Sequence, residues 1–133
     1  MIFVDTNVLM YAVGRDHPLR IGAQTFFEKA VDSHRNELCT SAEVLQELLH
    51  AYIPVNRWRT LDAALTLVDS CIPAVYPVDV EDVRAARLLA DSYRNLGARD
   101  LIHLAVCRRH SISEIKTFDR GLAAAFVRGS GQV

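Results

Sequence analysis

Short apolar runs alternate with longer amphipathic stretches along this chain. Four such runs, at residues 2–4, 37–39, 74–78 and 114–118, are bounded by polar or turn-forming residues and predict β-strands. Between the strands, apolar residues recur at helical spacing, which predicts helices over residues 16–34, 40–54, 56–70, 79–97 and 99–109. The alternation of strand and helix is typical of an α/β fold whose mainly parallel sheet is covered by helices.

Residues that begin or end helices set these limits. Pro18 is tolerated in a first turn, and residues 40–43 (Thr-Ser-Ala-Glu) have the pattern of a capping box. Asn56 and Asp79 are expected to cap the two helices that come after them. Gly97 fits the position just beyond a helix, where its freedom to adopt positive φ is useful.

No linker or repeat divides the chain before its last residues. The length of 133 residues suits one domain with a proper core. We therefore expect a single domain over residues 1–128, followed by a flexible tail at 129–133 that begins with Gly-Ser-Gly. No apolar run approaches the ~20 residues needed to cross a bilayer, and no signal-peptide pattern is present. These features predict a soluble, cytoplasmic protein with no membrane association.

Composition narrows the chemistry only slightly. The net charge of −1 does not indicate a nucleic-acid binder, although the basic residues are 13 arginines and two lysines. Arginine suits phosphate recognition, but genomic base composition explains the excess equally well. Cys39, Cys71 and Cys107 are widely spaced in apolar contexts, which predicts buried reduced thiols. Neither cysteines nor histidines show the spacing of a zinc site.

Two acids follow predicted strands directly. Asp5 comes after the first strand and Asp119 after the last. In a parallel sheet both side chains would emerge at the carboxyl edge, where ligands bind in such folds. The alternative is that each aspartate merely caps the next helix, which is the commoner role for a single aspartate in this position.

Two further acids belong to predicted helices. Glu47 lies at the margin of the apolar face of its helix, where a solvated residue is equally plausible. Asp100 begins a helix that is apolar nearly all round and shares a side with Leu104 and Cys107. The positive end of the helix dipole explains this acid without catalysis. Each acid thus has a structural explanation when taken alone.

Taken together, the four acids indicate a metal site. The predicted fold brings them to one edge of the sheet, where mutual repulsion would raise their pKa values unless a cation neutralised them. Oxygen ligands suit Mg²⁺ or Mn²⁺, and such ions activate water and stabilise a leaving oxygen. Thr6, Asn7 and Thr117 are placed to hydrogen-bond the carboxylates or the attacking water.

The chain resembles the PIN-domain ribonucleases, particularly the VapC-type toxins of bacterial toxin–antitoxin pairs. The resemblance covers almost the whole chain in the expected order. It is carried by residues 4–8 (Val-Asp-Thr-Asn-Val), Ser41 with Glu47 six residues later, residues 98–105 (Ala-Arg-Asp-Leu-Ile-His-Leu-Ala) and residues 117–120 (Thr-Phe-Asp-Arg). Each motif is weak alone, and the ordered set is fairly specific.

This resemblance implies an α/β/α sandwich that hydrolyses RNA with Mg²⁺ or Mn²⁺. Asp5 and Asp100 match the central metal ligands of the family, Glu47 the third acid and Asp119 the fourth. The resemblance also implies a homodimer and a cognate VapB-type antitoxin that holds the toxin inactive. All four acidic positions agree with the family pattern.

Several alternatives stay open at this level. Three arginines lie near the four acids in sequence: Arg15, Arg99 and Arg120. One alternative is that they bind RNA or antitoxin, and the other is that they form structural ion pairs with the acids. Residues 57–59 (Arg-Trp-Arg) are a candidate nucleotide clamp, with a packed helix start as the favoured explanation. The protein as a whole is a toxin, a non-toxic RNA-processing nuclease, or an inactive binding module. A phosphatase of the Asp-x-Asp type is disfavoured because Asn7 takes the place of its second aspartate.

Overall fold

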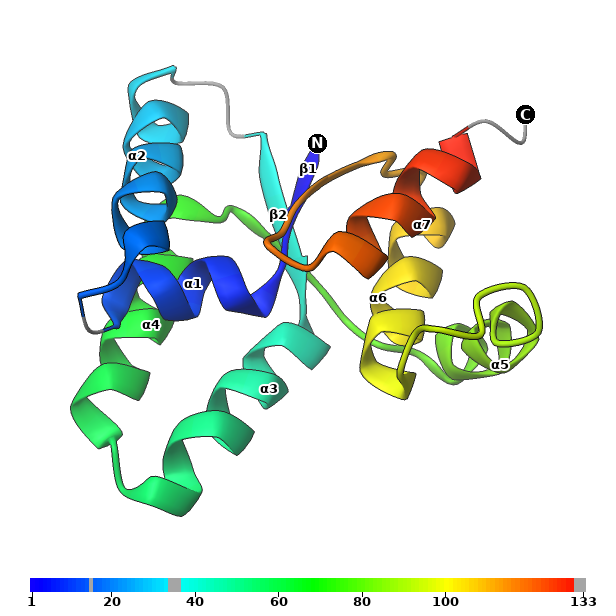
Figure 1. Ribbon diagram of the computed structural model, residues 1–133, viewed down its shortest axis with the longest axis horizontal. Coiled ribbons are helices and arrows are strands. Elements are labelled where there is room, and N and C mark those ends of the chain that lie inside the picture. Colours follow the sequence, from blue (N-terminus) through cyan, green and yellow to red (C-terminus); the bar gives the residue numbers. More distant parts are fainter. Residues whose placement is uncertain (15, 34–36, 131–133) are drawn as a thin grey trace.

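Four parallel strands form the centre of the computed structural model, which describes residues 1–14, 16–33 and 37–130 (Figure 1). The strands lie in the order β3-β2-β1-β4, and every neighbouring pair is parallel. Their bounds are β1 (Ile2–Val4), β2 (Leu38–Ser41), β3 (Ala74–Tyr76) and β4 (Glu114–Lys116). The four predicted strands and the parallel sheet are therefore confirmed.

Helices cover both faces of this sheet. Figure 1 shows α1, α2 and α4 on one side, α5, α6 and α7 on the other, and α3 beyond the end where β2 stops. The bounds are α1 (Thr6–Val13), α2 (Pro18–Asp32), α3 (Ala42–Tyr52), the short 3₁₀ helix η1 (Ile53–Val55), α4 (Trp58–Cys71), α5 (Val80–Leu89), α6 (Ala98–Arg109) and α7 (Arg120–Ser130). The three layers confirm the expected α/β/α architecture.

Two helices, α1 and α7, are not expected from the periodicity. Each begins directly after a strand-end aspartate. α1 has only eight residues and offers few repeats of an apolar pattern, whereas α7 has 11 residues, as many as α3. The predicted capping box at the start of α3 is wrong. Thr40 belongs to β2, where its hydroxyl donates to the Val4 carbonyl at 2.8 Å, and Ser41 precedes the helix without a side-chain cap.

Two other predicted helix ends are wrong. The helix after Asp79 stops at Leu89, and turns fill most of the stretch up to Gly97. Gly97 has a φ of −78° and precedes α6, so it ends no helix. Asn56 adopts a φ of 57° after η1, a conformation that asparagine tolerates well. Arg57, rather than Asn56, therefore takes the position before α4.

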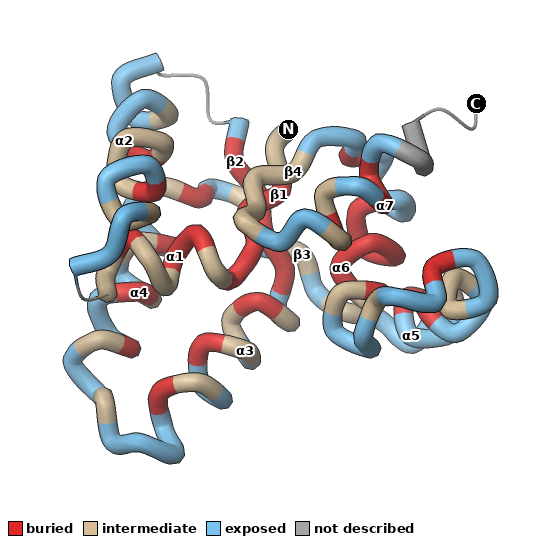
Figure 2. Tube along the Cα trace, viewed as in Figure 1, coloured by how far each residue is buried: buried red, intermediate tan, exposed pale blue. Residues whose placement is uncertain are grey.

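The core lies between the sheet and its helices. Figure 2 shows the buried residues concentrated along β1, β2 and α6. Phe3, Val8, Leu48 and Leu104 are almost completely buried there. The three cysteines are free thiols, but Cys71 is only partly buried, unlike Cys39 and Cys107. Among the described residues no helix is long and apolar enough to cross a membrane.

The predicted tail is partly helical. α7 continues through Ser130, which includes the first two residues assigned to the tail, and residues 131–133 lie outside the described part of the chain. The helix spans this Gly-Ser pair although glycine in a helix costs about 1 kcal/mol relative to alanine.

Candidate active site at the carboxyl edge of the sheet

Asp5 occupies the carboxyl end of β1 and is only 5% exposed. Its backbone N–H donates to the Lys116 carbonyl at 3.0 Å, which keeps the chain in register with β4 for one residue more. The carboxylate accepts hydrogen bonds from the Thr6 N–H at 2.8 Å and from the Thr117 hydroxyl at 2.7 Å. Burial raises the pKa of Asp5 although His103 and these two donors oppose the rise.

Thr117 joins the ends of β1 and β4. Besides donating to Asp5, its hydroxyl oxygen accepts from the Asn7 amide at 3.3 Å and from the Asp119 N–H at 3.0 Å. The Asn7 carbonyl oxygen in turn accepts from the Phe118 N–H at 3.2 Å. Asn7 therefore contacts the 117–118 backbone and hydroxyl but no carboxylate, whereas Thr117 bonds a carboxylate directly.

Asp119 is exposed and begins α7. Its carboxylate accepts from the Leu122 N–H at 3.1 Å, which is the geometry of a helix cap. Asp5 also caps a helix, α1, through its bond with Thr6. Capping, the structural alternative considered for both strand-end acids, is thus confirmed, and it leaves both carboxylates at the same edge of the sheet.

Glu47 reaches this edge from α3 and is held by two donors. The Thr6 hydroxyl donates to one carboxylate oxygen at 2.9 Å, and Nε2 of His103 lies 2.6 Å from the other. Burial works to raise the pKa of Glu47, but the hydrogen bond and charge of His103, together with Thr6, hold it below its ordinary value. The solvated alternative for Glu47 is therefore wrong.

His103 is a site residue that the sequence reasoning missed. It is fully buried on α6, and its Nε2 also lies 3.7 Å from an Asp5 oxygen. Burial of the ring opposes protonation, but the hydrogen bond and charge of Glu47 raise the pKa of His103 above its ordinary value. The available signal was a histidine three residues after Asp100 on a helix, since residues at that spacing share a face.

Asp100 lies one turn before His103 on α6 and is half-buried. No hydrogen bond to its carboxylate is present in the described part of the chain. Burial, followed by the charge of Asp5 and smaller contributions from Asp119 and Glu47, raises the pKa of Asp100 to about 6. The four acids are therefore electrostatically coupled, and we call Asp5, Glu47, Asp100 and Asp119 the carboxylate cluster.

The carboxylate cluster fits a divalent cation. One ligand atom each from Asp5, Glu47 and His103 lies within 4.8 Å of the other two, while Asp100 and Asp119 stand outside this tight group. A buried carboxylate is costly unless something compensates its charge, and burial raises the pKa of Asp5 and of Asp100 although His103 opposes the rise. Hard divalent cations prefer such oxygen ligands.

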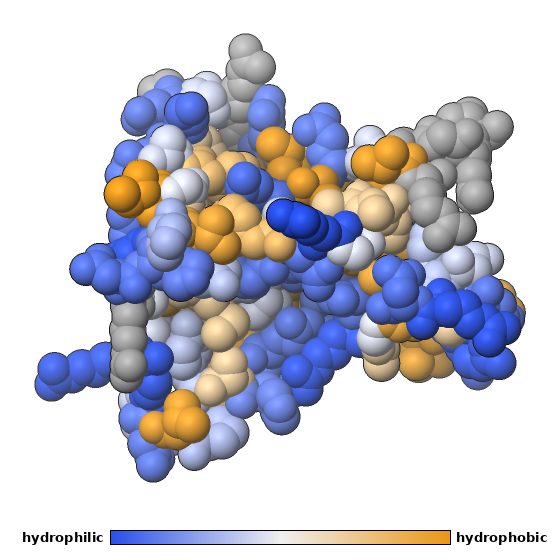
Figure 3. Space-filling model, viewed as in Figure 1, coloured by the Kyte–Doolittle hydropathy of each residue, from blue (hydrophilic) through white to orange (hydrophobic). Residues whose placement is uncertain are grey.

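The three arginines expected near the site differ in their surroundings. Arg99 forms an ion pair with Glu43, 3.9 Å between nitrogen and oxygen, and its charge also helps to lower the pKa of Glu47. Arg120 is exposed and has no ion pair among the described residues. Arg15 lies outside the described residues. Figure 3 shows hydrophilic side chains gathered between α3 and the start of α6, the elements that carry Glu47 and Asp100.

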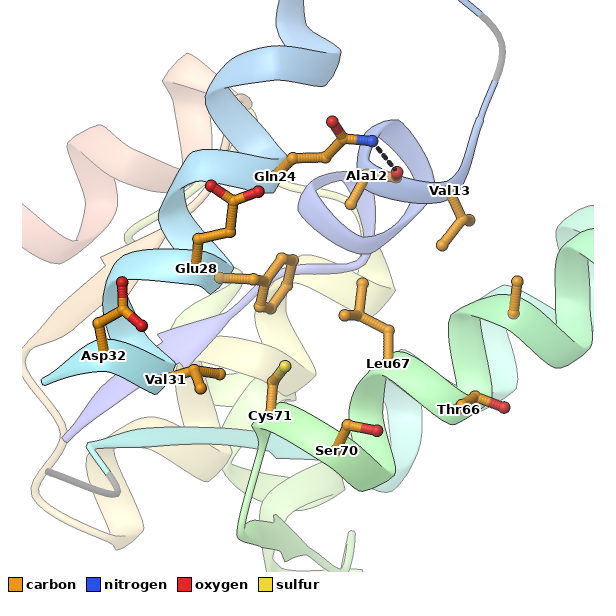
Figure 4. Close-up of a pocket in the computed structure, with 12 residues that line it drawn as sticks. Ala12, Val13, Gln24, Glu28, Val31, Asp32, Thr66, Leu67, Ser70 and Cys71 are labelled. Carbon is orange, nitrogen blue, oxygen red and sulfur yellow. Dashed lines mark hydrogen bonds between the residues drawn. The ribbon is translucent and has the colours of Figure 1, made fainter. Parts of the chain in front are cut away.

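A pocket of about 640 Å³ lies away from the carboxylate cluster, between α1, α2 and α4. Figure 4 shows Gln24 on α2 donating to the Ala12 carbonyl at 3.1 Å, with Leu67 and Cys71 of α4 across the pocket. Its lining is mostly apolar and its acids, Glu28 and Asp32, are far in sequence from the sheet-edge residues. The pocket brings no group to the cluster.

Comparison with known proteins identifies the family. A PIN-domain family model matches residues 2–126. Ribonuclease VapC23 of Mycobacterium tuberculosis is 57% identical over 126 residues, which cover 95% of this chain and 98% of that protein. Ribonuclease VapC13 of the same organism is 40% identical over 121 residues, covering 91% and 92%.

A solved structure has the same fold. The crystal structure of Mycobacterium tuberculosis VapC20, a Sarcin-Ricin loop cleaving toxin, matches with a TM-score of 0.75 at 24% identity and covers 94% of this chain and 95% of that chain. With the family match and the two ribonucleases, this architecture shows that the chain belongs to the PIN-domain family, among its VapC-type ribonucleases.

Proposed function

We propose that this protein is the toxin of a toxin–antitoxin pair and hydrolyses RNA phosphodiester bonds at the carboxylate cluster. The observation that carries the proposal is the convergence of four carboxylates from separate elements, two of them with raised pKa values, at the ligand-binding edge of a PIN fold. Asp5, Glu47, Asp100 and Asp119 are the catalytic residues in this proposal.

Mg²⁺, with Mn²⁺ as a substitute, is the proposed cofactor. Asp5 and Asp100 are its central ligands, with Glu47 and Asp119 contributing directly or through water. A bound ion of this kind lowers the pKa of water and stabilises charge on the phosphate and the leaving oxygen. The hydrogen bonds from Thr6 and Thr117 would orient the carboxylates of Glu47 and Asp5 before the cation arrives.

The remaining residues position the substrate. Arg120 is exposed beside Asp119 and free of ion pairs among the described residues, so it is available to bind an RNA phosphate. Arg99 is 44% exposed and only loosely paired with Glu43, and it can exchange that partner for phosphate or for an antitoxin carboxylate. Asn7 holds residues 117–118 against α1, which positions the loop that carries Asp119.

The proposal includes partners and location. A VapB-type antitoxin would inhibit the protein, and the chain would act as a homodimer in the cytoplasm, where RNA is available and free thiols persist. Two alternatives remain distinguishable: a nuclease without toxicity, and a binding module without catalysis. Both predict that expression of the wild-type chain alone leaves a bacterial host growing.

Metal dependence provides the first test. Purified protein with Mg²⁺ or Mn²⁺ should cleave total bacterial RNA, EDTA should stop the reaction, and excess metal should restore it. Induced expression should halt growth, and co-expression of the antitoxin encoded beside it should restore growth. Cleavage that continues in EDTA would contradict the metal mechanism, and cleavage in vitro without growth arrest would favour the non-toxic nuclease.

A second prediction concerns His103, which we expect to position Glu47. His103→Leu should lower the cleavage rate about ten- to a hundredfold, the usual range for residues that support metal ligands. His103→Gln should retain more activity, because its amide can still donate to Glu47. The rates should be measured across a metal titration, with thermal melts of both variants as the control for folding. Wild-type rates in both variants would show that Glu47 needs no such partner.

A further inference from the structure

A second concave site adjoins the carboxylate cluster. A pocket of about 480 Å³ is formed by α1, the residues that lead into α2, the end of α3 and Arg57. Asn7 belongs to its wall and also bonds Thr117, which in turn bonds Asp5. Only two hydrogen bonds therefore separate the pocket wall from a proposed metal ligand. The volume is in the range of small-ligand pockets.

The lining of this pocket is rich in π-systems. The rings of Tyr11 and His17 lie 4.7 Å apart at a tilted angle, and Phe118, which is not part of the lining, supports Tyr11 edge-on at 5.5 Å. Across the pocket, the Arg57 guanidinium lies 5.7 Å from the centre of the Tyr52 ring. Aromatic rings and arginine planes are the groups on which unpaired bases stack.

The polar groups of the pocket retain free hydrogen-bonding capacity. Among the described residues, the Arg57 guanidinium has no carboxylate partner and donates only a long bond of 3.4 Å to the Thr60 hydroxyl. The Tyr11 and Tyr52 hydroxyls have no hydrogen-bond partner in the same part of the chain. Asp16 stands at the mouth with a fully exposed side chain; its carboxylate accepts a long bond of 3.5 Å from Arg20 and can also accept from a base amino group.

We propose that this pocket receives one unpaired nucleobase of the RNA beside the scissile phosphodiester and so sets the base preference of cleavage. The inference rests on the proposed function. Tyr11 and His17 supply stacking surface, Arg57 supplies stacking and positive charge, and Asp16 selects for an exocyclic amino group. The pocket between α1, α2 and α4 is not suited to this role, because among its lining residues Phe27 is the one aromatic ring and none carries a positive charge.

Two variants and a matched control test this inference. Tyr11→Leu removes a stacking ring and Arg57→Gln removes the cation, while Arg84→Gln changes an exposed arginine of α5 that does not line the pocket. Cut sites are first mapped by sequencing RNA 5′ ends after digestion of total bacterial RNA. Four synthetic oligoribonucleotides are then made around the commonest site, differing only in the base at the preferred position.

The expected result is selective. The wild type and Arg84→Gln should prefer one base by about ten- to a hundredfold, the effect of one lost stacking contact. Tyr11→Leu and Arg57→Gln should reduce that preference to about threefold or less, chiefly because the preferred oligoribonucleotide is cut more slowly. An unchanged preference in both variants would overturn the inference. So would a wild type that cuts RNA without any base preference beside the cut.

A binding measurement separates this inference from the proposed function. The four ribonucleoside 5′-monophosphates are titrated into the wild type and into Asp5→Asn, and the Tyr11 and Tyr52 ring resonances are followed by NMR. Shifts in both proteins that favour one base support the pocket even where hydrolysis is absent. RNA cleavage without such shifts keeps the proposed function and removes the pocket.

Discussion

Asp5→Asn should lower RNA cleavage by about a thousandfold or more, which corresponds to roughly 4 kcal/mol of transition-state stabilisation. Asp5 is the residue on which the carboxylate cluster converges: His103 lies 3.7 Å from it, and its charge is the largest of those that raise the pKa of Asp100. An amide is a poor ligand for a divalent cation in place of a carboxylate and contributes no negative charge.

The same substitution should leave the fold intact. The asparagine oxygen can still accept from the Thr6 N–H, so the cap of α1 is retained. The substitution also removes a buried carboxylate whose pKa is already raised by burial. In EDTA the variant should therefore melt at or above the wild-type temperature. Mg²⁺ should raise the melting temperature of the wild type much more than that of the variant, because only a ligand that binds the native state stabilises it.

Thermal melts with and without Mg²⁺, together with cleavage of total RNA, check this prediction. An Asp5→Asn protein that unfolds in EDTA would show that the aspartate is chiefly structural. Near-wild-type cleavage by a folded variant would remove Asp5 from the catalytic residues. The exposed Asp91→Asn is a suitable control, because Asp91 pairs only with Arg87 on the surface and should affect neither measurement.

Asp82→Asn should produce a large loss of stability, about 2–3 kcal/mol of unfolding free energy at neutral pH. Asp82 is only 1% exposed, and its carboxylate accepts from two Arg109 nitrogens at 2.7 and 2.8 Å and from the Asp79 N–H at 2.8 Å. The bidentate pair fastens α5 to α6. In the variant, the asparagine amide N–H₂ donors face the donors of the Arg109 guanidinium. The negative charge that compensates the guanidinium is also lost.

This stabilisation should depend on pH in a defined direction. The Arg109 hydrogen bonds hold the pKa of Asp82 below its ordinary value against the effect of burial, and the Asp79 N–H and the charges of Arg109 and His110 add to the lowering. A depressed folded-state pKa contributes stability that is fully present above the unfolded pKa of about 4 and lost as the pH falls further. The gap between wild type and Asp82→Asn should therefore be constant from about pH 5 to 7 and narrow below about pH 4.

Urea unfolding of both proteins across this pH range measures the gap. Asp91→Asn is the matched control, because the Arg87–Asp91 pair is also an arginine–aspartate contact, 3.2 Å long, but more than half of each side chain is exposed. Its loss should cost less than about 1 kcal/mol. A gap that widens at low pH, or a control variant as unstable as Asp82→Asn, would contradict the assignment.

Local pattern was sufficient for the strands and for the identity of the acids. A strand of three apolar residues with a polar residue after it is recognisable from its neighbours, and parallel strands bring the residues at their carboxyl ends to one edge. Asp5 and Asp119 could therefore be assigned to a common edge from the sequence, whereas Glu47 and Asp100, on helices, were added through the expected fold and the family resemblance. The structural alternatives for Asp5 and Asp119 are compatible with that placement, because each helix cap uses one carboxylate oxygen; the second oxygen of Asp5 accepts from Thr117.

Helix limits were less predictable where packing overrides local preference. Threonine is a residue type that often caps helices, but pairing of β2 with β1 places the Thr40 hydroxyl against the Val4 carbonyl. Glycine is a residue type that often follows a helix, but α5 ends eight residues before Gly97, and the chain turns there to bring α6 against α5. Competition of this kind depends on partners distant in the sequence.

The chemistry of individual residues therefore comes from local order, and the connections among them come from packing. A run such as Val-Asp-Thr-Asn indicates which side chains lie at the end of β1. It does not state that Glu47 and His103, 56 residues apart, lie 2.6 Å from each other, or that Asp82 is bound by Arg109 across two helices. Hydrogen bonds of that kind exist only when the core has closed, because burial then places the groups together and removes the water that would otherwise satisfy each of them.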